Sequence, residues 1–144
     1  LLMDLQRANG RSIILITLDL GVVARMAEHV LVMYAGQIVE PGSVDDSFYR
    51  SGHPYTLGLR AAMPTNDPNA AQRLTPIDGS PPDLFHPPAG CGYCARCPYA
   101  MQICADQPPD LQDLAAGHGA RCWLHHADNT QQVEGINLHS ADAS

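Results

Sequence analysis

Five cysteines crowd into one stretch near the carboxyl end of this chain, and they constrain its fold more than any other feature. They are all the cysteines that the sequence has, and they follow the spacing C-x2-C-x2-C-x6-C-x17-C at Cys91, Cys94, Cys97, Cys104 and Cys122. Thiols this close in sequence are typical of a site where several thiolates converge on one metal ion or cluster. An odd number of cysteines fits a closed disulfide framework poorly. The spacing therefore predicts metal or cluster ligation in a reducing compartment.

The charge balance argues against several classes of partner. The chain has 8 basic residues, all of them arginine, against 15 acidic ones, for a formal net charge of -7. Binding to nucleic acid or to an anionic membrane surface needs clusters of basic residues. The longest apolar run, near Ile13 to Ile16, is far shorter than the ~20 residues that cross a bilayer. We therefore expect no nucleic-acid partner and no direct membrane insertion.

The amino-terminal part of the chain follows an alternating helix and strand pattern. Apolar spacing predicts a helix over residues 1–9, with Gly10 as its carboxyl-terminal stop. The β-branched run Ser12–Thr17 is typical of a strand buried on both faces. Asp19 can then cap a helix that reaches about Glu28.

A second buried strand is expected at His29–Tyr34, followed by a turn at Ala35-Gly36 and a returning strand at Gln37–Glu40. The order strand, helix, strand favours a parallel sheet of the α/β class. These few strands would leave apolar edges unpaired. We therefore expect residues 1–40 to complete a sheet whose other strands lie upstream of Leu1.

Two short helices, a proline-rich segment and a tail are expected next. Ser43 can cap a helix, and His53-Pro54 can start another that runs to about Met63. The proline-rich residues 64–88 are expected to be extended. The polar residues after His126 lack apolar periodicity and are typical of a disordered tail.

The spacing within the cysteine-rich stretch predicts how two of the thiols meet. Pro98 can open a helix that reaches Cys104. Cys97 lies seven residues before Cys104, so the two would lie on the same face, two turns apart. His118 and His125 are interpreted as loop histidines that hydrogen-bond locally. Asp45, Asp46 and Asp67 are interpreted as scattered, solvated carboxylates.

Several stretches resemble a known family. ILITLDLGVVARMAEHVLVMYAGQIVEPG resembles the last part of an ABC-transporter nucleotide-binding domain. HPYTLGLRAAMP, LTPIDGSPPDL and GCGYCARCPYAMQIC resemble the ATP-binding subunits of dipeptide and oligopeptide importers. The resemblance runs from Leu1 to about His126. It implies an α/β fold with two parts: a partial P-loop NTPase (ABC ATPase) parallel sheet over residues 1–63 and an irregular Pro- and Cys-rich lobe over 64–126. The composition predicts a disordered tail over 127–144.

The resemblance also implies a function. The full-length family binds ATP and Mg²⁺, pairs with a second ATP-binding subunit, and drives membrane-spanning permease subunits that import di- and oligopeptides. It implies a peripheral place on the cytoplasmic face of the bacterial inner membrane. This chain has no lysine and hence no G-x-x-x-x-G-K-[ST] loop. The family's Mg²⁺-binding strand end and signature loop would also precede Leu1, so this chain alone is expected not to hydrolyse ATP.

One position of the family's catalytic switch falls inside the chain and departs from the pattern. The family has histidine where this chain has Leu18, with Thr17 and Asp19 on either side near the nucleotide. Leucine has neither a donor nor an acceptor to offer the γ-phosphate or the attacking water. Either the subunit has a weakened ATP site, or the change is incidental in a decayed or truncated copy.

The resemblance assigns Cys91, Cys97, Cys104 and Cys122 to a [4Fe–4S] cluster, with a four-cysteine Zn²⁺ site as the alternative. Cys94 has no counterpart in the family's pattern, so it is either a spare thiol or one that exchanges with Cys91. Two further interpretations stay open for the whole chain. It could be a stand-alone iron–sulfur or zinc-binding module, or a non-functional remnant of a truncated coding region.

Overall fold

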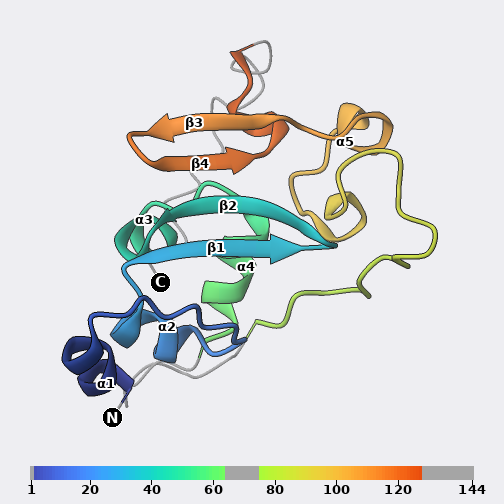
Figure 1. Ribbon diagram of the computed structural model, residues 1–144. Helices are drawn as coiled ribbons and strands as arrows, with labels where there is room; N and C mark the ends of the chain where they lie inside the picture. Colours follow the sequence, from blue (N-terminus) through green and yellow to red (C-terminus); the bar gives the residue numbers. More distant parts are fainter. Residues whose placement is uncertain (1, 64–74, 128–144) are drawn as a thin grey trace, which may run out of the picture.

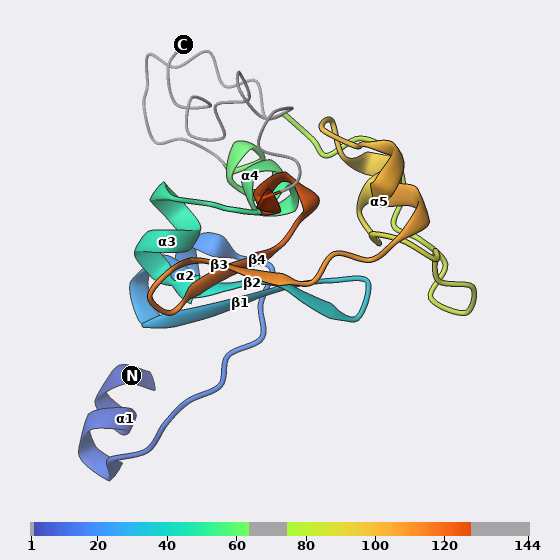
Figure 2. The ribbon, with the colours of Figure 1, turned by 90° about the horizontal axis from the view of Figure 1, so that it is seen from above.

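The computed structural model describes residues 2–63 and 75–127, and these fold around two small antiparallel sheets (Figure 1). The first sheet pairs β1 (His29–Tyr34) with β2 (Gln37–Ser43). The second pairs β3 (Leu111–Ala115) with β4 (His118–Arg121). β4 lies next to β2, so the two hairpins pack on one another at the centre of the molecule (Figure 2). The architecture is a small mixed α/β domain.

The β1–β2 hairpin forms where the sequence predicts it. Ala35 and Gly36 both have positive φ, at 49° and 79°. A two-residue turn needs this conformation to match the twist of its flanking strands. β2 continues beyond the expected end at Glu40 as far as Ser43. A bulge between Val32 and Met33 shifts the register of the pair.

The helices begin at the capping residues that the sequence predicts. Asp19 caps α2 (Leu20–Met26), because its Oδ1 accepts hydrogen bonds from two backbone N–H groups of the first turn, at 2.8 and 3.1 Å. Ser43 caps α3 (Val44–Tyr49) in a capping box with Asp46. His53 caps α4 (Pro54–Ala61) through Nδ1, which accepts from the N–H of Tyr55 at 3.0 Å.

The amino-terminal helix is also as expected, and its apolar side is uncovered. α1 spans Leu2–Asn9, and Gly10 follows with a φ of 58°. Leu2 and Leu5 are each nearly half exposed. No helix among the described residues is long and apolar enough to cross a membrane.

The strand predicted at Ser12–Thr17 is wrong for this structure. No strand of the described residues pairs with this segment. Its alternate side chains lie in solvent, with Ile14 and Ile16 92% and 94% exposed. A strand needs a hydrogen-bonded neighbour on at least one edge, and apolar composition alone does not supply one. The described residues accordingly hold two antiparallel hairpins and no parallel sheet.

The cysteine-rich lobe also differs from the expected helix at Pro98. α5 begins only at Gln102 and ends at Asp106, after a turn in which the N–H of Ala100 donates to the carbonyl of Cys97 at 3.2 Å. Cys97 therefore precedes the helix and does not share a helical face with Cys104. Two 3-10 turns complete the lobe, η1 (Cys94–Arg96) and η2 (Trp123–His125).

Two other expectations meet the structure only in part. The described part of the proline-rich segment is extended except for a turn closed by the N–H of His86, which donates to the carbonyl of Asp83 at 3.3 Å. Arg96 holds the segment by donating to the carbonyls of Ile77 and Asp78 at 2.9 and 2.8 Å. The rest of that segment, 64–74, and the predicted tail from 128 lie outside the described residues. The β3–β4 hairpin was not expected from the sequence, although Gly117, with a φ of 76°, marks its turn.

Candidate functional site

All five cysteines line one small, mainly apolar cavity. The wall also includes His53, two tyrosines and Leu124, and the cavity volume is about 10 Å³. Cys104 and Cys122 are buried, whereas Cys91, Cys94 and Cys97 are half-buried. Among residues 2–63 and 75–127, no three His, Cys, Asp or Glu side chains are grouped closely enough to hold one metal ion. The thiols therefore converge on a common space without presenting a finished set of ligands.

Backbone hydrogen bonds fix the loop that carries the first three thiols. Two turns follow one another: the N–H of Cys94 donates to the carbonyl of Cys91 at 3.0 Å, and the N–H of Cys97 to that of Cys94 at 3.2 Å. The N–H of Cys91 donates to the carbonyl of Cys104 at 2.7 Å, which ties the loop to α5. Gly90 allows this approach, since a Cβ there would collide with the backbone of α5.

The apolar cavity disfavours thiolates. Burial, as the main cause, raises the pKa of Cys97 to about 11 and that of Cys122 to about 12. Burial also raises the pKa values of the Cys91 and Cys94 thiols. Desolvation disfavours the charged form of an acid, so these thiols are protonated at neutral pH. A bound cation reverses this preference, because a coordinating thiol loses its proton.

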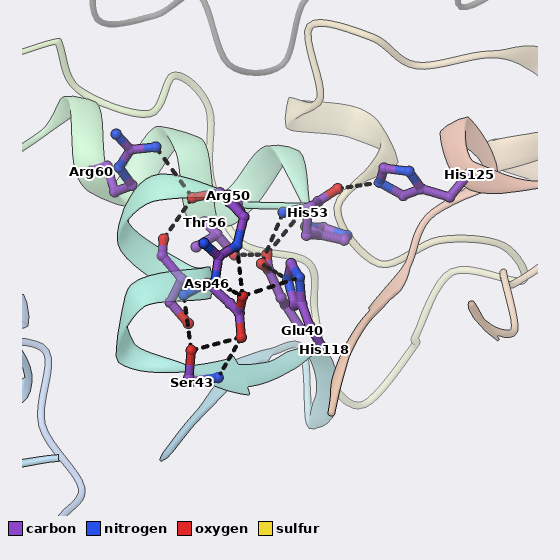
Figure 3. Close-up of polar contacts among 12 residues, drawn as sticks. Glu40, Ser43, Asp46, Arg50, His53, Thr56, Arg60, His118 and His125 are labelled. Atoms are coloured by element: carbon purple, nitrogen blue, oxygen red, sulfur yellow. Dashed lines mark hydrogen bonds and ion pairs between the residues drawn. The ribbon is translucent and has the colours of Figure 1, made fainter. Parts of the chain in front are cut away.

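A buried carboxylate holds the domain together (Figure 3), and one of its partners, His53, also lines the thiol cavity. Glu40, on β2, is 0% exposed. Its oxygens accept from the N–H groups of Gly52 and His53, both at 2.8 Å, and from Oγ1 of Thr56 at 2.6 Å. They also lie 2.9 Å from Nε2 of His118 on β4. A buried charge is tolerated only with such complete pairing. We refer to Glu40, Gly52, His53, Thr56 and His118 as the Glu40 network.

A second carboxylate extends this network. Asp46 lies 3.8 Å from Nδ1 of His118, so this imidazole stands between two acidic side chains. Hydrogen bonds from Ser43, and then from Arg50 at 2.6 Å, hold the pKa of Asp46 well below its ordinary value. The interpretation of Asp46 as a solvated carboxylate is therefore wrong.

The two histidines expected to bond locally do the opposite. His118 bonds to Glu40, 78 residues away, and Nε2 of His125 lies 2.6 Å from the carbonyl oxygen of Gly52, 73 residues away (Figure 3). His118 joins the end of the cysteine-rich lobe to β2, and His125 joins it to the residue before the cap of α4. Sequence reasoning missed Glu40 entirely. The available signal was an ionisable residue directly after the apolar pair Ile38-Val39 of β2.

The residues expected near a nucleotide lie together in one exposed turn. Oγ1 of Thr17 accepts from the N–H of Asp19 at 3.0 Å, and Asp19 caps α2. Leu18, between them, is 96% exposed. These contacts are local, and each is explained by the start of α2.

Comparison with known proteins identifies the region around both sites. Residues 39–104, from the strand that carries Glu40 to the fourth cysteine, match the family described as "Oligopeptide/dipeptide transporter, C-terminal region". This region of the chain belongs to that family.

Relatives with longer matches agree with this result. The Bacillus subtilis oligopeptide transport ATP-binding protein OppD is 50% identical over 128 residues, which cover 89% of this chain and 36% of the relative. The Bacillus subtilis dipeptide transport ATP-binding protein DppD is 50% identical over 121 residues, or 84% of this chain and 36% of the relative. The Salmonella typhimurium OppD is 46% identical over 85% of this chain and 36% of its own length. The chain thus spans little more than a third of these relatives.

Proposed function

We propose that the chain is the C-terminal part of the ATP-binding subunit of an ABC importer for dipeptides or oligopeptides. The observation that carries this proposal is the family match over residues 39–104, which contains Glu40, the α4 motif HPYT and the first four cysteines. The Glu40 network gives that match a physical basis. It explains why a buried acid on β2 accompanies the helix-starting sequence His53-Pro54 and the threonine two positions later.

In this proposal residues 1–63 end a nucleotide-binding domain, and residues 64–126 form the attached lobe. The exposed apolar side chains support such a division. Ile14 and Ile16 precede α2, and Leu31 and Met33 project from β1 at 60% and 59% exposure. A parallel P-loop sheet completed by further strands would cover them. Binding of ATP and Mg²⁺, pairing with a second ATP-binding subunit, docking to permease subunits and a place on the cytoplasmic membrane face all belong to that larger assembly.

The thiols have the chemistry to hold an inorganic centre. We propose Cys91, Cys97, Cys104 and Cys122 as the ligands of a [4Fe–4S] cluster, with Zn²⁺ as the alternative. Four soft thiolates and a mainly apolar wall suit the chemistry of both. The cavity, about 10 Å³, is the size of one water molecule, so it must widen to take a four-iron cluster. Among the described residues no three of these side chains are grouped closely enough to hold one ion, so the geometry favours neither centre. The centre would join the loop of Cys91 and Cys97 and helix α5 to Cys122, which directly follows β4 of the β3–β4 hairpin.

A chimera tests the proposed parentage. The corresponding segment of Bacillus subtilis OppD would be replaced by residues 1–126 of this chain, and peptide uptake measured in cells that lack OppD. We expect uptake to be retained, and to be lost with Glu40→Ala in the same chimera. A well-expressed chimera that assembles but transports nothing, even with Leu18→His, would contradict the proposal.

The same chimera decides what Leu18 does. If the position weakens the ATP site, Leu18→His should raise ATP hydrolysis by roughly 10²-fold, the size of one lost transition-state contact. An unchanged rate would mean that the residue is incidental.

The inorganic centre needs a separate measurement. Anaerobic purification of the chain, followed by a visible spectrum and by iron and zinc analysis, should find four irons and a brown protein. One zinc in a colourless protein would select the alternative. A chain that binds neither metal, while its thiols are reduced, would rule out both.

A further inference from the structure

The fifth thiol has no role in a four-cysteine centre, and its position suggests one. We propose that Cys94 and Cys91 form a reversible disulfide, so that this loop is a site of thiol oxidation within the cavity. The claim about the disulfide depends only on the geometry of the loop. Its consequence for metal binding rests on the function proposed above.

The turn hydrogen bond places the two residues at the right separation. The N–H of Cys94 donates to the carbonyl of Cys91 at 3.0 Å, which closes a four-residue turn. The ends of such a turn have Cα atoms less than about 7 Å apart. Disulfides join Cα atoms about 4.4–6.8 Å apart. The sequence Cys91-Gly92-Tyr93-Cys94 therefore has the C-x-x-C form in which vicinal thiols exchange.

Exposure restricts the choice of partner. Cys104 and Cys122 are 8% exposed each and are shielded from a reagent in solution. Cys91, Cys94 and Cys97 are half-buried and can be reached. Only Cys94 takes part in both turns, so the accessible pairs are Cys91 with Cys94 and Cys94 with Cys97.

Rigidity separates these two pairs. The second turn contains Arg96, whose guanidinium donates to the carbonyls of Ile77 and Asp78 and, at 3.1 Å, to Oη of Tyr34. These bonds hold that turn in place. The first turn is anchored too, because the ring of Tyr93 is buried in the core, but it contains Gly92, which has the widest choice of backbone conformation. The turn from Cys94 to Cys97 has no glycine, so the backbone between Cys91 and Cys94 is the one that can adjust to disulfide geometry.

The chemistry balances with a small disulfide such as oxidised glutathione as the oxidant. One of the two thiols, as the thiolate, attacks a sulfur of oxidised glutathione and releases one glutathione. The other thiol then attacks the mixed disulfide and releases the second. Two protein thiols are oxidised to one disulfide, and one glutathione disulfide is reduced to two glutathiones. The product removes Cys91 from the four-cysteine set, so oxidation would block assembly of the inorganic centre until the disulfide is reduced.

A linkage map of the whole chain tests the disulfide directly. The reduced chain is equilibrated with oxidised glutathione, alkylated and digested. Chymotrypsin cuts after Tyr93 and separates Cys91 from Cys94, and trypsin cuts after Arg96 and separates Cys94 from Cys97. We expect the dominant cross-link to join the Cys91 and Cys94 peptides, with two fewer alkylated thiols, and dithiothreitol to reverse it. A dominant cross-link to Cys97 or Cys104, or no protein disulfide at all, would overturn the assignment.

Two variants sharpen the result. Cys94→Ser should keep all four remaining thiols reduced under the same conditions, as alkylation after denaturation would show, whereas Cys97→Ser should still form the cross-link. If Cys94→Ser oxidises as fast as the unaltered chain through another pair, Cys94 is not the responsible thiol. If a variant fails to fold, the linkage map of the unaltered chain still tests the assignment, because it needs no substitution.

Added Zn²⁺ separates this inference from the proposed metal site. We expect the reduced chain to bind Zn²⁺, the oxidised chain to bind it at least tenfold more weakly, and oxidised Cys94→Ser to bind it as the reduced chain does. A reduced chain that binds neither Zn²⁺ nor iron would refute the metal site and leave the disulfide standing. Equal Zn²⁺ binding by reduced and oxidised chains would refute the link between them.

Discussion

The Glu40 network and the thiol cavity are neighbours that share His53. They differ in whether their buried polar groups have hydrogen-bond partners. Glu40 has four donors for its two oxygens, at 2.6–2.9 Å. The thiols line an apolar cavity, and burial there raises the pKa values of Cys91, Cys94, Cys97 and Cys122, the last to about 12. The carboxylate is fully paired by the described residues, whereas the thiols would be completed by the centre proposed above. We therefore expect the first site to determine whether the domain folds and the second to determine whether it carries that centre.

The largest effect that can test this contrast is removal of the Glu40 carboxylate. Glu40→Ala leaves two backbone N–H groups, a threonine hydroxyl and His118 without their acceptor. Breaking a buried pair by removing one partner costs about 3–5 kcal/mol. Chemical denaturation should show this loss in the free energy of unfolding. Glu28→Ala, at an exposed acid of the same length, is the matched control and should cost almost nothing.

Lowering the pH should reduce the free energy of unfolding through His53, the residue that the two sites share. Burial, and then the charge of His125, lowers the pKa of His53 from its ordinary 6.5 to about 4. Its Nδ1 caps α4 only when it carries no proton. The folded state therefore binds fewer protons than the unfolded state between pH 6.5 and 4. The stabilisation is complete above pH 6.5 and is lost as the pH falls to about 4, a change of about 3 kcal/mol at 1.36 kcal/mol per pH unit.

The control for this pH profile is His53→Asn, because asparagine can cap a helix and does not titrate. The variant should remove the slope between pH 6.5 and 4. The Asp46 carboxylate acts in a separate range, since its lowered pKa stabilises the fold above its ordinary 3.8 and that contribution is lost below it. An unchanged slope between pH 6.5 and 4 in His53→Asn would mean that another group is responsible.

The next effect is confined to the thiol side of the comparison. Gly90→Ala places a Cβ against the backbone of Cys104 and Ala105, which cannot move as a flexible side chain can. Overpacking of this kind costs about 1–3 kcal/mol. Ala95→Ser, at an exposed position of the same lobe, is the control and should be neutral. Hydrogen exchange should show loss of protection at the N–H of Cys91, with β1 and β2 unaffected; loss in both regions would mean that the lobe and the hairpins unfold as one unit.

The same contrast explains which parts of the structure could be predicted from the sequence. The starts of α2, α3 and α4 depend on Asp19, Ser43 and His53, each acting on neighbours within a few positions, and all three were predicted. All five cysteines line one cavity, in line with their close spacing, although the helix used to explain it begins later than expected and no three of them are grouped closely enough to hold one ion. Glu40 and His118 were missed because their pairing spans 78 residues and leaves no local pattern.

The prediction of a strand at Ser12–Thr17 was wrong for the same reason, because strand pairing also depends on residues outside the local sequence. The runs Ser12–Thr17 and His29–Tyr34 are both apolar and β-branched, and only the second is a strand. The difference is the turn Ala35-Gly36, which brings β2 beside the second run. The pattern of apolar residues predicts which side chains a strand would bury. Whether the segment becomes a strand depends on a neighbouring strand that can hydrogen-bond to its backbone.

The smallest expected change in the free energy of unfolding comes from replacing Cys94, and it contrasts with the larger change expected at the buried Cys122. Without metal, Cys94→Ser should change the free energy of unfolding by no more than about 0.5 kcal/mol, because Cys94 is half-buried and its hydroxyl replacement can reach water. Cys122→Ser puts a hydroxyl at an 8% exposed position in an apolar wall and should cost about 1–3 kcal/mol. Adding the bound centre should widen this gap, since Cys122→Ser removes a proposed ligand and Cys94→Ser does not. If both variants lose the centre equally, Cys94 is itself a ligand, and the division of the five thiols into four and one is wrong.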